Sequence, residues 1–97
     1  MYTTGQKPAL PLPYEQPKQI GRTFVTLKER HYIIDVYPYQ NYSGDGELVW
    51  TAYKWDGRKW PKIPCFTRAE ENRFPKTIAR LASYFLEECK QLAKIAV

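Results

Sequence analysis

Hydrophobic and polar side chains alternate along residues 48–55, as they do on the two faces of a β-strand. The alternation reaches Asp56-Gly57, and a second run follows from Arg58 to Lys62. Asp-Gly between two such runs favours a two-residue type I′ turn, which needs positive φ at both central residues. We therefore expect a β-hairpin over residues 48–62, and this segment holds all three tryptophans of the chain.

Two further strands are expected upstream of this hairpin. Residues 23–27 are rich in β-forming side chains, and residues 31–37 follow after the short polar connection Lys28-Glu29-Arg30. Pro38 is expected to end the second of these strands, and residues 41–46, with two glycines, form a loop. The strand that begins at Arg58 has to pass two prolines, so it should be short and lie at a sheet edge.

The last third of the chain has the periodicity of a helix. Apolar residues recur there at steps of three and four, at Phe74, Ile78, Leu81, Phe85, Cys89, Leu92 and Ala96. A capping box at residues 67–70 suggests a short turn, after which the main helix restarts at Pro75. The predicted fold is α+β: a four-stranded antiparallel sheet (β-β-β-β) followed by one long C-terminal amphipathic helix packed on one face.

The first 20 residues differ from the rest of the chain. They contain four prolines among Gln, Thr and Lys, a composition that favours an extended arm and excludes a helix. We expect a Pro-rich arm over residues 1–20 and a single domain over residues 21–97. Leu10, Leu12 and Tyr14 are the arm residues with apolar surface to dock on that domain or on a neighbouring subunit.

Strand parity sorts the sheet residues into two faces. The face predicted to pack on the helix is mainly aliphatic and consists of Val25, Leu27, Ile34, Val36, Leu48, Trp50 and Ala52. The opposite face is mixed and aromatic, and consists of Phe24, Thr26, Lys28, Ile33, Asp35, Tyr37, Tyr39, Val49, Thr51, Tyr53 and Trp55. We expect this second face to be open and to meet a partner.

The net charge is +5 and the sequence pI is near 9.3, but the charge is spread along the chain. Residues 1–20 carry +1, residues 21–66 carry +2 and residues 67–97 carry +2. Because the chain has no basic tail, affinity for a polyanion has to come from patches that folding creates.

The residues needed for metal binding or catalysis are sparse. Cys65, Cys89 and His31 do not form a zinc-ligand pattern, and no phosphate-binding glycine loop is present, so we expect no metal, no cofactor and no enzymatic activity. Two cysteines without a signal peptide favour buried thiols in a reducing compartment. No segment approaches the roughly 20 apolar residues of a membrane span, and we expect a soluble cytoplasmic protein.

Aromatic rings interleaved with cations are typical of surfaces that bind single-stranded nucleic acid, with rings stacking on bases and cations meeting phosphates. We therefore predict a module that binds single-stranded DNA or RNA through the aromatic sheet face and the hairpin. The predicted binding residues are Lys28, Tyr37, Tyr53, Lys54, Trp55, Arg58, Lys59, Trp60 and Lys62. A homodimer or higher homo-oligomer is expected because one core of this size is marginal. The alternative is a protein-binding adaptor or inhibitor that uses the same face or the Pro-rich arm.

The segment Lys62-Ile63-Pro64-Cys65-Phe66-Thr67-Arg68-Ala69-Glu70 resembles the C-terminal end of the Whirly proteins, where an edge strand runs into the last helix. The order of four strands and a helix is also similar to one unit of the Whirly and Pur-repeat families. This resemblance implies binding of single-stranded DNA or RNA by dimers or higher assemblies. The Lys-rich binding motif of the Whirly proteins has no counterpart in this chain, so no residue role is carried over.

Overall fold

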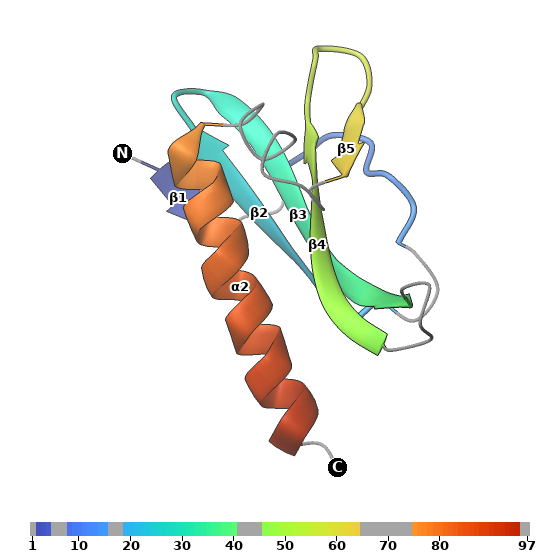
Figure 1. The fold of residues 1–97 in the computed structure, drawn as a ribbon. Helices are drawn as coiled ribbons and strands as arrows, with labels where there is room; N and C mark the ends of the chain where they lie inside the picture. Colours follow the sequence, from blue (N-terminus) through green and yellow to red (C-terminus); the bar gives the residue numbers. More distant parts are fainter. Residues whose placement is uncertain (1, 5–7, 16–18, 41–45, 65–74, 96–97) are drawn as a thin grey trace.

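The fold is an antiparallel β-sheet with one long helix packed across one face (Figure 1). The computed structural model describes residues 2–4, 8–15, 19–40, 46–64 and 75–95. The strands pair in chain order as β1 (Tyr2–Thr4), β2 (Gly21–Leu27), β3 (Arg30–Gln40), β4 (Gly46–Lys54) and β5 (Lys62–Pro64), and the helix is α2 (Lys76–Ile95). The α+β class, the antiparallel central strands β2, β3 and β4, and the C-terminal helix are as predicted from the sequence.

The tight turn of the sheet lies between β2 and β3. Lys28 and Glu29 have φ values of 50° and 66°, and they are the two residues between the paired ends Leu27 and Arg30. Two central residues with positive φ define a primed turn, whose twist matches that of the flanking strands. The sequence predicted a tight connection here but assigned the type I′ geometry to Asp56-Gly57.

The predicted two-residue turn at Asp56-Gly57 is wrong. Gly57 has a φ of 99°, whereas Asp56 is not among the residues with positive φ. Residues 55–61 instead form a wider connection without strand structure. The predicted fourth strand from Arg58 is therefore not found; only the three residues of β5 pair with β4, near the prolines that limit pairing.

Pro38 does not end β3, which continues to Gln40. The carbonyl oxygen of Val36 accepts a hydrogen bond from the Ile20 amide at 2.8 Å, so Val36 directs its backbone groups toward the β2 side. Pro38, two residues further on, faces the same side at a point beyond the start of β2. Pro38 pairs with Leu48 of β4, but no strand is paired with it on the β2 side, where its missing amide donor is therefore tolerated.

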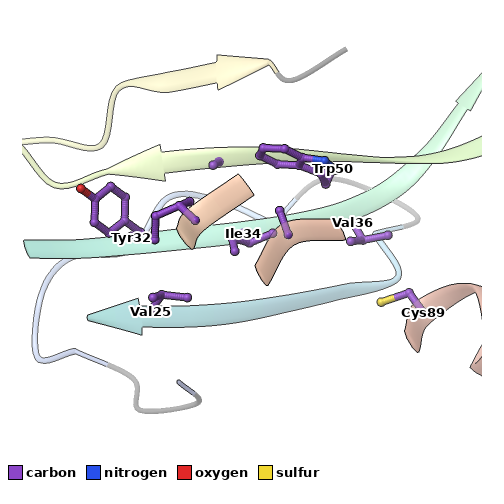
Figure 2. Close-up of a cluster of buried hydrophobic side chains, with 9 residues drawn as sticks. Val25, Tyr32, Ile34, Val36, Trp50 and Cys89 are labelled. Carbon is purple, nitrogen blue, oxygen red and sulfur yellow. The ribbon is translucent and has the colours of Figure 1, made fainter. Parts of the chain in front are cut away.

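The core lies between α2 and the aliphatic sheet face, as strand parity predicted. Its buried side chains come from all three central strands and from the helix, and Figure 2 shows them converging (Val25, Tyr32, Ile34, Val36, Trp50, Ala52, Ile78, Ala82 and Cys89). Leu27 and Leu48 pack at its margin. Gly21 allows the close approach of α2, because a Cβ atom there would lie 3.0 Å from Phe85 Cζ.

The helix begins as expected directly after Pro75, whose carbonyl oxygen accepts hydrogen bonds from the amides of Ile78 (2.9 Å) and Ala79 (3.3 Å). The capping box at residues 67–70 and Phe74 lie outside the described residues. Leu92 was predicted to face the core but is 64% exposed. Cys89 already lies near Gly21, the first residue of β2, so α2 has passed the end of that strand when it reaches Leu92.

The second sheet face is not the open surface expected from the sequence. Five of its predicted members are buried: Ile33, Asp35, Tyr37, Thr51 and Tyr53. Residues 8–15 of the Pro-rich arm run along this side, opposite α2 (Figure 1). The arm thus contributes to covering the face, a contact between distant parts of the chain that strand parity does not reveal.

Candidate nucleic-acid interface

The loop between β4 and β5 presents two tryptophans in contact with each other. The ring centroids of Trp55 and Trp60 are 5.1 Å apart and the ring planes are inclined by 53°. This separation is within the range of favourable aromatic pairs. Both side chains are partly exposed, so the pair combines mutual support with accessible ring surface.

Asp56, near the start of the loop, stabilises its conformation through backbone hydrogen bonds. Its Oδ1 atom accepts hydrogen bonds from the backbone amides of Arg58 (2.8 Å) and Lys59 (2.7 Å), and its own amide donates to the Lys59 carbonyl oxygen (3.1 Å). The amide of Lys59, followed by that of Arg58, lowers the pKa of the Asp56 carboxyl below its usual value because both bonds favour the ionised form. The side chains of Arg58 and Lys59 are left exposed.

Cations from three elements gather at this end of the sheet. The turn between β2 and β3, the loop after β4 and the start of α2 all lie at the upper end of Figure 1. Together with the adjoining ends of β3 and β4, they carry six basic side chains, from Lys28, Arg30, Lys54, Arg58, Lys59 and Lys76. The acidic residues of the same segments are Glu29 and Asp56, so the described residues at this end are predominantly basic. We call these six residues the cationic end.

A cavity opens within the cationic end. It has a volume of about 410 Å³ and is lined by Arg30, Lys54, Trp55, Asp56 and Pro61. Backbone pairing places its walls: the Trp55 amide donates to the His31 carbonyl oxygen at 3.0 Å, and Lys54 pairs with Tyr32 across β3 and β4. The end of β4 therefore lies beside the beginning of β3, where Arg30 is located.

The structure brings most of the predicted binding residues together. Trp55, Arg58, Lys59 and Trp60 lie in one loop directly after Lys54, the last residue of β4, and Lys28 lies in the neighbouring turn of the cationic end. Lys62 is in β5 opposite Tyr53, but its side chain lies outside the described part of the structure.

Two predicted residues lie apart from that loop surface. Tyr37 is only 9% exposed and Tyr53 only 6% exposed. Stacking on a base needs a free ring face. Neither tyrosine has a free ring face, so the exposed aromatic surface lies on the loop and not on the sheet face.

The Pro-rich arm is fastened to this region by side chains of the domain. The indole Nε1–H of Trp60 donates to the Pro11 carbonyl oxygen at 2.5 Å. Arg22 donates to the carbonyl oxygens of Pro13 (2.8 Å) and Tyr14 (3.4 Å). Trp60 therefore has one edge bound to the arm and one side against Trp55.

Arg22 is itself held by an ion pair with Asp35. Its Nε and Nη2 atoms lie 2.7 and 2.9 Å from the two carboxylate oxygens, and the two side chains are 7% and 0% exposed. The hydrogen bond to Asp35 raises the pKa of Arg22, which stays charged. This bidentate pair occupies the centre of the covered face, where the sequence left Asp35 without an expected partner.

Sequence reasoning missed Arg30 and Pro61 as parts of the cavity wall. Their proximity depends on the register of β3 against β4, which pairs Tyr32 with Lys54 across a connection outside the described residues. Nothing in the local pattern determines that register. Sequence reasoning also missed that the carbonyl oxygens of Pro11 and Pro13 accept hydrogen bonds from the domain, because every residue has a backbone carbonyl and the sequence does not mark the ones that are used.

Other candidate chemistry is limited in the part of the chain that the structure describes. No group of three or more His, Cys, Asp or Glu side chains lies together there as a metal site would require. His31 Nδ1 lies 3.2 Å from Thr26 Oγ1 on the paired strand. Cys89 is a buried free thiol, and burial raises its pKa, while Cys65 lies outside the described residues.

Within the described ranges, no helix is long and apolar enough to cross a membrane. A scan against protein-family models found no match to this chain, and searches of curated proteins and of solved structures also returned none.

Proposed function

We propose that this protein binds single-stranded DNA or RNA at the loop after β4 and the cationic end around it. The observation that carries the proposal is the tryptophan pair, with its 5.1 Å centroid separation, flanked by the exposed cations Arg58 and Lys59. Unpaired bases stack on aromatic rings for about 1–3 kcal/mol each, and cations neutralise the phosphates between them. Duplex DNA does not offer free base faces, so single strands are preferred.

The proposed surface differs from the one expected from the sequence. Trp55 and Trp60 do the stacking, whereas Tyr37 and Tyr53, which are buried, support the sheet beneath them. Lys28, Lys54, Arg58 and Lys59 contact phosphates. The positive charge of this end suits either a nucleic acid or an acidic patch on a protein. The exposed tryptophan rings beside that charge favour the nucleic acid.

A fluorescence titration tests the proposal. Trp50 is 4% exposed and lies in the core, so quenching by an oligonucleotide reports on Trp55 and Trp60. We expect single-stranded DNA or RNA to quench the emission more strongly than duplex DNA, and the affinity to fall as salt is raised. Absence of binding to all three oligonucleotides at low salt would contradict the proposal and leave an adaptor or inhibitor of another protein as the remaining function.

We also propose that two or more copies associate inside the cell. A folded body of roughly 75 residues buries a limited core, and association is a common way to supplement it. Light scattering tests this part separately. The mass of a single 11.5 kDa chain at working concentration would contradict association without affecting the proposed binding surface.

A further inference from the structure

The cavity in the cationic end has the size and the wall chemistry of a small-ligand site. Its volume of about 410 Å³ falls in the range of about 300–1,000 Å³ found for such sites. The walls come from the first residue of β3, the last residue of β4 and both ends of the following loop. A site assembled from two paired strands and a hydrogen-bonded loop is held in place before a ligand arrives.

The cavity carries positive charge that the described structure does not neutralise. No hydrogen bond or ion pair joins the Arg30 or Lys54 side chain to another described residue. Asp56 is the single carboxylate among the described lining residues, and its Oδ1 atom is occupied by two backbone amides. Two available cations next to one engaged carboxylate favour an anionic ligand.

The remaining walls are ring surfaces. Trp55 supplies an indole and Pro61 a pyrrolidine ring, both partners that a planar base can pack against. Trp60, which lies against Trp55, is not part of the cavity lining, so it supports the indole from outside. Cations and a ring in one cavity match a ligand that joins a phosphate to a heterocyclic base.

We propose that this cavity holds one nucleotide unit of the bound strand, with its base against Trp55 and its phosphate at Arg30 and Lys54. The inference rests on the proposed function and adds a defined subsite to it. It also assigns a role to Arg30, which sequence analysis did not select. The remaining nucleotides pass over Trp60, Arg58 and Lys59 outside the cavity.

The test uses AMP and adenosine as probes, with the resonance of the Trp55 indole N–H followed by NMR. The Trp55→Phe variant assigns that resonance. We expect AMP to bind about a hundredfold more tightly than adenosine, because each of the two charge-assisted contacts, to Arg30 and to Lys54, contributes about tenfold. Arg30→Gln removes the charge and keeps a polar side chain, and it should weaken AMP about tenfold while leaving adenosine unchanged. Lys54→Ala should act in the same direction.

Lys90→Ala is the matched control, because Lys90 lies on α2 and is 42% exposed in a surface pair with Glu87. Equal binding of AMP and adenosine, or an Arg30→Gln variant that binds AMP like the wild type, would overturn the cavity assignment. Oligonucleotide binding that persists in that case keeps the proposed function. A third outcome is that Arg30→Gln weakens AMP binding while oligonucleotides bind no better than AMP. This outcome supports the cavity as a nucleotide site and contradicts the strand-binding function.

Discussion

Asp56 shows how one side chain can shape the candidate site through hydrogen bonds to the backbone. The sequence placed it in a turn for conformational reasons, and the location was correct. Its carboxylate, however, accepts two backbone amides and opens the turn into a wider loop. This matters for binding, because the same two amides belong to Arg58 and Lys59, whose side chains we propose to contact phosphates.

The loop should loosen in acid as Asp56 takes up a proton. Its folded-state pKa is lowered from the ordinary value of 3.8, chiefly by the Lys59 and Arg58 amides. A lowered pKa means that the stabilisation is complete above the ordinary value and is lost as the pH falls through the folded value. NMR titration should show the Asp56 carboxyl and the two amides shifting together, and Asp56→Asn should remove the transition. A carboxyl that titrates at 3.8 or above would contradict this.

The turn between β2 and β3 carries a local conformational cost. Glu29 has a φ of 66°, a region that a side chain with a Cβ atom disfavours by roughly 1–2 kcal/mol. Glu29→Gly should therefore raise the free energy of unfolding by about 0.5–1 kcal/mol in urea. Glu47→Gly is the control, since Glu47 is also exposed but lies within β4, where glycine destabilises. A loss of stability in Glu29→Gly would contradict the turn geometry.

At the level of elements, local patterns predicted the central strands and the helix because burial enforces their periodicity. The aliphatic residues of β2, β3 and β4 face α2 as parity required. The prediction that Pro38 ends its strand was wrong, because a proline interrupts a strand only where its missing amide would have paired with a neighbouring strand. Whether such a neighbour is present depends on the whole sheet. Docking of the arm was expected through apolar side chains, whereas its hydrogen bond to Trp60 was missed because Pro11 and Trp60 are 49 residues apart in sequence.

The Arg22–Asp35 pair links the sheet to the arm, and we expect Asp35→Ala to be severely destabilising. Removing one partner of a buried ion pair costs about 3–5 kcal/mol, because the other charge is left without compensation. Urea unfolding should show this loss. The double variant Arg22→Met with Asp35→Leu removes both charges and should be less destabilised than the single variant. A single variant that loses less than about 1 kcal/mol would show that the pair behaves as an exposed one.

Across the whole molecule, folding concentrates charge that is evenly spread in the sequence. The three segments of the chain carry similar net charges, yet the turn after β2, the loop after β4 and the start of α2 meet at one end. Composition therefore predicted a basic protein but not the position of its basic surface. The tryptophans and cations of the hairpin were chosen from sequence as candidate binding residues, whereas the position of Arg30 in the cavity wall depends on the fold.

The salt dependence of oligonucleotide affinity tests whether the loop cations contact phosphates. Each phosphate contact on a single strand contributes about 0.7 to the slope of log affinity against log salt. We expect Arg58→Ala with Lys59→Ala to weaken single-strand binding and to reduce that slope by about 1.4. Arg80→Ala with Lys90→Ala, which removes the same charge from α2, should leave the slope unchanged. An unchanged slope in the loop variant would show that the strand does not bind at this loop.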